Sequence, residues 1–278
     1  MDSNVISAIV GAIVGATLAW ALTYSQFRYS KKKSRIEKSI EMAKEFECIL
    51  SDLKFDVSGI LLRLAKDNDI NLDLIDADEQ LDFSRQELYD KIKKEKAKKF
   101  LGSMEKKSIS FLKHLASFRF NRPDVKAIQL EAAIRKFDDN LSLDKNIDNL
   151  ADRFSADDKS KIAFKLDLMA YINELAIEFD SQVNTVLNKL EWMSMYFNLG
   201  VADENVVYQS LHQTMLNTIT ALYIWISYRN TDPCEKYYDN VITLFNRWHE
   251  KRNKKRQEYT KKRKKLDKTG KISSKSIR

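Results

Sequence analysis

An uncharged, mostly apolar run of twenty residues, Val5 to Tyr24, constrains the fold of this chain more than any other feature. At 1.5 Å per residue, a helix of this length measures about 30 Å, which matches the hydrocarbon core of a bilayer. The run is followed at once by a cluster of basic residues: Arg28, Lys31, Lys32, Lys33 and Arg35. Because Lys and Arg collect on cytoplasmic flanks, we predict a single-pass anchor over residues 1–27 in the inner (cytoplasmic) membrane, with the N-terminus outside and the C-terminus cytoplasmic.

A cleaved signal peptide is the competing interpretation of this run. Ala19-Trp20-Ala21 resembles a small-x-small cleavage site. A signal peptide also needs a positively charged start, however, and here Asp2 is the only charged side chain before the run. We therefore favour the anchor.

Small residues recur at every fourth position of the predicted anchor, at Ser7, Gly11, Gly15 and Ala19. This spacing lets two helix backbones approach closely, as in GxxxG dimers. Gly and Ala are also common in spanning helices without any such role. We expect a homo-oligomer that forms through the transmembrane helix.

Composition and charge favour long helices with an uneven charge distribution. The 278 residues include six Gly and two Pro, which leaves few tight turns. The net charge is +8, and residues 247–278 alone hold fifteen Lys or Arg against three acids. Cys48 and Cys234 have no metal-binding spacing, and we expect them to be free, buried side chains.

Apolar periodicity predicts an all-α fold, with an antiparallel helical bundle after the anchor. Residues 28–153 are predicted to form juxtamembrane helices and loops, with helices over 35–66, 84–118 and 125–137. Residues 138–153 are predicted as a loop with at most one turn of helix. The bundle core covers 154–250, and its strongest stripe runs from Ile162 to Phe197 in steps of three or four. The basic tail, 251–278, has almost no apolar residues, and we expect it to be disordered.

Capping signals predict where these helices begin and end. Ser155 and Asp158 resemble a capping box, Gly200 suits a C-terminal cap, and Asp203 suits the next N-cap. The segment from Asp232 to Glu235 combines an N-cap acid, Pro and a following acid, which predicts the start of the last helix.

An acidic segment, residues 67–82, separates the first two cytoplasmic helices. Its start, Asp67-x-Asp69-x-Asn71-x-Asp73, imitates a calcium loop. The sixth position is Leu72, where the EF-hand turn requires Gly, and the twelfth is an Asp. We expect a solvated loop and no metal site.

Several short segments resemble a bacterial family catalogued as domain of unknown function 4760. They are residues 187–192, Leu199-Gly200, Glu204, Tyr228-Arg229 and residues 244–248. The resemblance covers about 161–251, and it implies a helical cytoplasmic domain behind one N-terminal span, without an activity. The positions that would correspond to the family's motif are Asn188, Glu191, Arg229 and Trp248.

Asn188 and Glu191 lie three residues apart on one helix face, within reach of Arg229 or Arg247 from neighbouring helices. A buried Glu–Arg pair would fix the helix register and add little net stability. The functional alternative is an anion or ligand pocket. We favour the structural interpretation of this polar cluster.

No motif in the sequence indicates a reaction. His114, His212 and His249 have no second ligand at helical spacing, and neither a Gly-rich phosphate loop nor a nucleophile elbow is present. We therefore expect an interaction protein without cofactors, although a hydrolase with an unrecognised carboxylate site stays an alternative.

The basic tail is the clearest candidate for an interaction surface. Three partners compete: anionic phospholipid headgroups, nucleic acid, and solvent alone. Few aromatic residues interrupt the run, so base stacking is poorly supported, and a tethered domain already lies near the anionic leaflet of the lipid bilayer. We favour lipid, bound by Lys251, Arg252, Lys254, Lys255, Arg256, Lys261, Lys262, Arg263, Lys264 and Lys265.

Taken together, these features predict a membrane-anchored sensor, scaffold or regulatory protein with a protein partner. Its architecture suits a role in envelope stress or phage defence. The alternative is a membrane-tethered nucleic-acid-binding protein that uses the C-terminal basic helix.

Overall fold

A computed structural model shows an all-helical protein. It describes residues 3–275 except 52, 74, 76–79, 121–124, 156 and 233, and the side chains of 3–16, 49, 51 and 266–275 lie outside the described set. In this part of the chain the only strand-like pairing is an isolated bridge between Phe55 and Arg119. The helices are α1 (Ser3–Ser51), α2 (Val57–Asp67), α4 (Arg85–Lys91), α5 (Lys94–Glu105), α6 (Ile109–Ser117), α7 (Val125–Arg135), α8 (Leu143–Phe154), α9 (Asp158–Asn198), α10 (Glu204–Arg229) and α11 (Asp239–Lys275).

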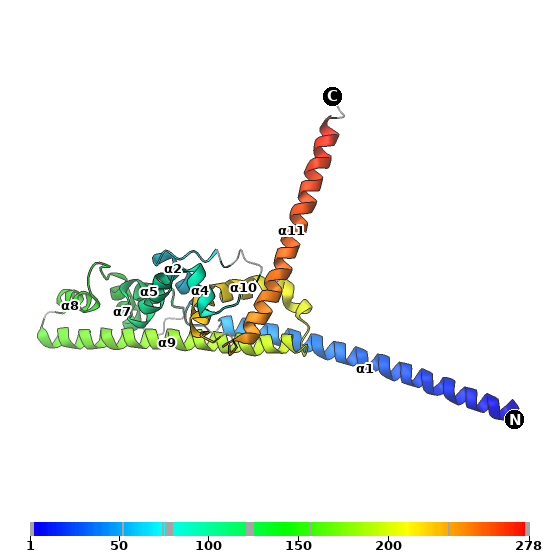
Figure 1. Ribbon diagram of the computed structural model, residues 1–278. Coiled ribbons are helices and arrows are strands. Elements are labelled where there is room, and N and C mark those ends of the chain that lie inside the picture. Colours follow the sequence, from blue (N-terminus) through cyan, green and yellow to red (C-terminus); the bar gives the residue numbers. More distant parts are fainter. Residues whose placement is uncertain are drawn as a thin grey trace.

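The long helix α9 supports the body, and the shorter helices lie along one side of it (Figure 1). α9 packs against α1, α6, α8 and α11, while α10 packs against α1, α2, α4 and α11. The apolar stripe predicted for α9 is confirmed from Ile172 to Phe197, whose members are buried. It is wrong for the first turns of the helix, where Ile162, Leu166 and Met169 are exposed. Gly200 follows α9 with a φ of 67°, and Asp203 caps α10, so both of these predictions are also confirmed.

An aromatic cluster joins α10, α11 and the segment before α4. The ring of Phe83 lies edge-on to those of Tyr223 and Phe245, with centroids 5.1 and 5.3 Å away. Trp248 is fully buried on α11 and contacts Tyr208 of α10 in the same geometry, at 5.4 Å. Such aromatic pairs stabilise a core by more than their buried area alone.

The boundary of α2 shows why the predicted helix over 35–66 is wrong as a single element. α1 ends at Ser51 and α2 begins at Val57, where the Asp56 side chain accepts a hydrogen bond from the backbone N–H of Gly59 at 2.8 Å. A Cβ atom on Gly59 would lie 2.7 Å from the Asp56 carboxyl carbon. The glycine therefore allows the cap to fold back over the first turn.

The predicted helix over 84–118 is also wrong, because it divides into α4, α5 and α6. Ser84 and Ser108 each act as N-caps, and Lys107 takes a left-handed φ of 50° between α5 and α6. Serine competes for backbone hydrogen bonds and so favours helix starts over helix interiors.

The segment 138–153, predicted as a loop, contains the helix α8. Ser142 caps it, and Ile147 and Leu150 are buried against the core. Asn146 is buried as well: its side chain donates to the backbone carbonyl of Asp138 at 2.9 Å and so holds the preceding turn. Buried polar side chains of this kind weaken the apolar pattern on which sequence interpretation relies.

Two predicted helix starts are displaced. Asp157 rather than Ser155 caps α9, accepting from the backbone N–H of Ser160 at 3.0 Å. Asp232 accepts from the N–H of Cys234 within a turn, and α11 begins only at Asp239. The cysteine prediction also fails in part, because both Cys48 and Cys234 are exposed.

The acidic segment after α2 is packed against the bundle, contrary to the predicted solvated loop. Ile70, Leu72, Ile75 and Leu81 are buried among its acids. Residues 74 and 76–79 of this segment lie outside the described set. The described apolar side chains therefore fix its path, while the side chains of Asp67, Asp69, Asp73 and Asp82 are exposed.

The basic tail is helical, which corrects the prediction of disorder. α11 runs from the core to Lys275 without a break and extends beyond the body (Figure 1). Lys, Arg, Gln and Glu are good helix formers, and the buried first turns of α11 provide the nucleus that an isolated basic helix lacks.

α1 is a single helix that crosses the proposed boundary at residues 27 and 28, and it extends from the body in a different direction from α11 (Figure 1). Within the residues whose side chains the structure describes, no helix contains an apolar stretch long enough to cross a membrane. Most side chains of the predicted span, including those of Ser7, Gly11 and Gly15, lie outside the described set. The anchor therefore stays a prediction.

Candidate functional site

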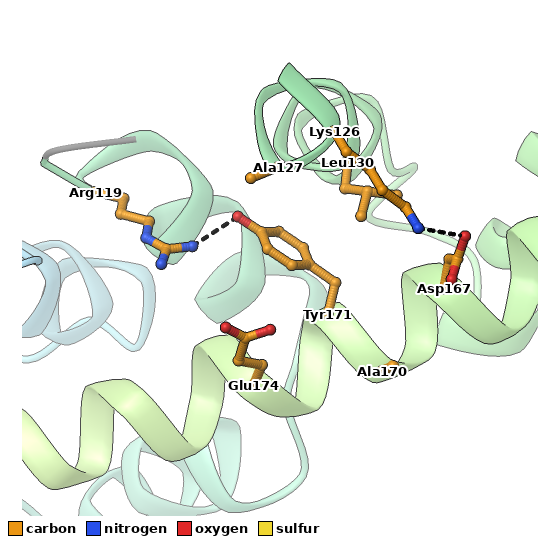
Figure 2. Close-up of a pocket in the computed structure, with 8 residues that line it drawn as sticks. All are labelled: Arg119, Lys126, Ala127, Leu130, Asp167, Ala170, Tyr171 and Glu174. Carbon is orange, nitrogen blue, oxygen red and sulfur yellow. Dashed lines mark hydrogen bonds and ion pairs between the residues drawn. The ribbon is translucent and has the colours of Figure 1, made fainter. Parts of the chain in front are cut away.

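A pocket of about 260 Å³ lies between α7 and α9, next to the bridge residue Arg119 (Figure 2). Tyr171 of α9 stands between Arg119 on one side and an ion pair between Lys126 and Asp167, at 2.8 Å, on the other. The pocket is lined by Arg119, Lys126, Ala127, Leu130, Asp167, Ala170, Tyr171 and Glu174.

Behind this pocket, a buried polar network joins three elements. Arg119 donates to the Tyr171 hydroxyl at 2.7 Å and to Glu178 at 3.0 Å, and the Tyr171 hydroxyl donates to Glu131 at 2.9 Å. The side chains of Arg119 and Glu131 are only 4% and 0% exposed. Charges so deeply buried must be paired, because an unpaired one would be strongly destabilising.

Burial, aided by the hydrogen bond to Glu131, raises the pKa of the Tyr171 phenol well above its usual range. The phenol therefore stays protonated and keeps donating at neutral pH. It serves as a fixed link between α7 and α9 rather than as an acid or base, because proton transfer requires a pKa near the working pH. Sequence analysis missed this network, since Arg119 lies outside any periodic pattern.

The predicted polar cluster is present, but its members have other partners than expected. Glu191 accepts hydrogen bonds from the side-chain and backbone N–H groups of Asn240, at 2.7 and 3.2 Å, and from the backbone N–H of Val241 at 3.0 Å. It thus caps the N-terminus of α11, where a carboxylate is favoured by the helix dipole. Asn188 is exposed. The predicted pairing of Glu191 with an arginine is therefore wrong.

The two arginines of that cluster lie in separate places. Arg247 pairs with Glu204 at 2.8 Å, and the same carboxylate accepts from the indole N–H of Trp248 at 3.2 Å. This contact joins the start of α10 to α11. Arg229, at the end of α10, donates to Asn184 at 3.1 Å and to the Tyr238 hydroxyl at 3.4 Å.

Arg229 also lines a second pocket, of about 240 Å³, between α5, α9 and α10. Its guanidinium carbon lies 4.9 Å from the centre of the Trp225 ring. The wall consists of Leu101, Met104, Glu105, Asp180, Trp225, Tyr228 and Arg229. One cation, two acids, an indole and two apolar side chains therefore meet at one surface opening.

Ser110, His114 and Asp67 meet at the end of α2, although sequence analysis placed them in unrelated segments. One oxygen of Asp67 accepts from the Ser110 hydroxyl and lies 2.7 Å from His114 Nε2, which is 3.4 Å from Ser110 Oγ. A catalytic triad requires the acid and the serine to contact different ring nitrogens. Here both contact Nε2, so the group does not form a triad.

Burial alone would raise the pKa of the Asp67 carboxyl, but the hydrogen bonds from Ser110 and His114 have the larger combined effect. The resulting pKa of Asp67 therefore lies below its usual value. Asp67 is therefore ionised at neutral pH.

Nowhere in the described part of the chain do three metal-binding side chains gather in one place.

The ten predicted basic contact residues divide into two groups along α11. Lys251 and Arg252 belong to the body: Lys251 donates to Asn205 at 2.7 Å, and its ammonium lies 4.1 Å from the Tyr208 ring, while Arg252 is buried. The other eight side chains, between residues 254 and 265, are exposed, although the Lys255 ammonium still lies 4.8 Å from the Tyr208 ring of the body. We call this part of α11, residues 254–265, the basic arm.

Residues 112–248 match the model of a protein family described as Domain of unknown function (DUF4760). This match confirms the resemblance and extends it upstream from residue 161 to residue 112. The matched region begins within α6 and ends at Trp248, so it contains the first pocket, the Arg119 network and the Glu191 cap. The second pocket lies only partly within it, because Leu101, Met104 and Glu105 precede residue 112. No curated protein and no solved structure matches the chain.

Proposed function

We propose that this protein is a single-pass membrane protein whose helical bundle faces the cytoplasm and acts as a regulatory docking module. The observation that carries the proposal is the division of α1 into two halves with opposite surroundings. Trp20 is 69% exposed, and Leu18, Leu22 and Phe27 project from the body with it, whereas Phe46 is 2% exposed in the core.

Exposed apolar side chains on a projecting helix require a cover. At about 25 cal/mol per Å² of apolar surface, the transfer of this segment from water into lipid is strongly favourable. The basic residues from Arg28 to Arg35 then lie at the headgroups of the cytoplasmic leaflet. Trp20 and Tyr24 stack on one another, with centroids 5.5 Å apart, near the level at which aromatic belts form.

The other half of α1 attaches this segment firmly to the bundle. The Ser39 hydroxyl donates to the carbonyl of Asp203 at 2.9 Å and accepts from the N–H of the same residue at 2.6 Å. Met42 and Phe46 are buried in the core, and the ammonium of Lys38 lies 4.9 Å from the Tyr196 ring. An anchor mounted in this way suits a sensor or scaffold, whose output depends on a partner rather than on a reaction.

Membrane extraction tests the anchor. The wild-type protein should remain in the carbonate-washed membrane pellet, and a C-terminal reporter should be active only in the cytoplasm. Replacing Ala12 and Val14 with Arg should release the protein, because each Arg at a span centre raises the insertion free energy by about 2.5–3.5 kcal/mol. Ser34→Arg, which adds the same charge beside the basic cluster, is the control and should stay in the pellet. Release of the wild-type protein by carbonate would refute the proposal.

The second candidate function is that of a membrane-tethered nucleic-acid-binding protein, and the basic arm favours it. The arm leaves the body in a different direction from the N-terminal half of α1 (Figure 1). Its basic side chains are exposed, and Lys254 pairs with Glu250 at 2.5 Å. Such a helix is able to reach a polyanion away from the anchor.

Two binding measurements separate this candidate from lipid binding by the same arm. Duplex DNA or RNA should bind with an affinity that falls steeply with salt, whereas lipid binding should require anionic vesicles. A variant with Lys261 to Lys265 changed to Gln should lose whichever binding exists. Equal behaviour of wild type and variant in both assays would remove the arm as an interaction surface. A role in envelope stress or phage defence stays a prediction from architecture alone.

A further inference from the structure

We propose that the pocket between α5, α9 and α10 binds a small α-amino acid, with its carboxylate at Arg229 and its ammonium group at Glu105 and Asp180. This inference does not depend on the membrane anchor or on the basic arm. It follows from the chemistry of the groups that surround one pocket of about 240 Å³.

Arg229 is held in place while part of its hydrogen-bonding capacity remains available. Both of its hydrogen bonds to described residues, to Asn184 and Tyr238, come from Nη1. The guanidinium stacks on Trp225 at 4.9 Å, which fixes the plane of the group. Nη2 and Nε therefore form an oriented edge, and this edge matches the two oxygens of a carboxylate.

Trp225 lines the same pocket and carries a hydrogen-bond donor without a described partner. Its indole Nε1 is buried and has no hydrogen-bond partner among the described residues. A buried donor without a partner destabilises a fold by about 1–3 kcal/mol, so such groups are rare in native proteins. An acceptor oxygen on a bound ligand would satisfy it.

The acids of the pocket distinguish the class of ligand. Glu105 and Asp180 lie in the same wall, and neither forms an ion pair with a described cation. Asp180 is open to solvent on one side, yet burial of its carboxyl raises the pKa, and the charge of Arg229 only partly opposes this. A simple anion would be repelled by the two acids, and a simple cation by Arg229. A zwitterion satisfies both signs of charge.

The remaining wall sets the size of the ligand. Leu101 and Met104 add apolar side chains to the lining, as a small aliphatic side chain of the ligand requires. Pockets for drug-sized ligands begin at about 300 Å³, so this smaller pocket suits a molecule of about the size of alanine or leucine.

Isothermal titration calorimetry on the full chain in detergent tests the proposal. L-Alanine or L-leucine should bind saturably, whereas N-acetyl-L-leucine, which lacks the ammonium group, and L-leucinamide, which lacks the carboxylate, should bind at least tenfold more weakly. Arg229→Gln should weaken amino-acid binding tenfold or more, and Glu105→Gln, at an exposed position where folding is not at risk, should weaken it several-fold. Arg256→Gln on the basic arm is the matched control and should bind like the wild type.

Three results would overturn the proposal. The first is the absence of saturable binding of both amino acids to the wild-type protein. The second is equal affinity for L-leucine and N-acetyl-L-leucine, which would show a simple anion site. The third is unchanged binding in both Arg229→Gln and Glu105→Gln, each confirmed as folded by circular dichroism, which would place the ligand elsewhere.

Discussion

Removal of the Glu191 carboxylate provides the most direct test of how α11 is held against α9. In Glu191→Ala, the first turn of α11 loses the acceptor of three hydrogen bonds between 2.7 and 3.2 Å long. Loss of an N-terminal cap is worth about 1 kcal/mol, and loss of a negative charge at a helix N-terminus about 0.3–1 kcal/mol. The Asn240 amide, left without this acceptor, adds roughly 1 kcal/mol. We expect a total of about 2–3 kcal/mol.

Urea unfolding followed by circular dichroism measures this change. Glu191→Gln, which keeps one acceptor oxygen but no charge, should lie between the wild type and Glu191→Ala. Asn188→Ala, one turn earlier on the exposed side of α9, is the matched control and should change the free energy of unfolding by less than about 0.5 kcal/mol. If Glu191→Ala and Asn188→Ala unfold at the same urea concentration, Glu191 is not the cap of α11.

Three further predictions test separate parts of the fold. Tyr171→Phe should lower the free energy of unfolding by about 1–3 kcal/mol, since it leaves buried partners without the phenol; an unchanged urea midpoint would contradict the network. Gly59→Ala should fail to give the stabilisation of about 1 kcal/mol that helix propensity predicts, because the Asp56 cap must move, and the paired variant Gly102→Ala, at an open helix position, should show that gain in thermal unfolding. The pKa of Asp67 is lowered in the folded state, so its stabilising contribution is present above the unfolded pKa of about 3.9 and is lost as the pH falls further; the difference in stability between wild type and Asp67→Asn should therefore shrink between pH 5 and pH 3, and a constant difference would exclude this linkage.

The long helices were predictable because their apolar residues repeat over many turns. Leu175, Phe179 and Leu190 all point to the core in the order that the sequence indicates. The short helices α4, α5 and α6 were not predictable, because their apolar pattern continues across the breaks between them. The breaks are set by serine caps and by a lysine with left-handed backbone angles. Helix α8 escaped prediction because buried Asn146 interrupts its apolar face. The helical state of the basic arm depends on the buried turns that precede it rather than on its own composition.

The candidate sites depend on tertiary contacts that helix periodicity does not encode. The sequence placed Glu191 correctly as an inward polar residue, but its partner is a helix N-terminus that lies about fifty positions further along the chain. The Arg119 network and the group formed by Asp67, Ser110 and His114 each combine residues from separate helices. Arg229 was identified from the family resemblance, while its stacking on Trp225 became visible only in the structure.

The unbroken course of α1 has a mechanical consequence. A helix resists bending and twisting over its whole length, and the Ser39 hydroxyl ties this one to the connection between α9 and α10. A rotation or sliding of the outer half of α1, for example when two copies associate, would therefore displace the Asp203 cap and with it the start of α10. Because Glu204 at that start also binds Arg247 and Trp248 of α11, torque applied at one terminus would reorient the basic arm at the other.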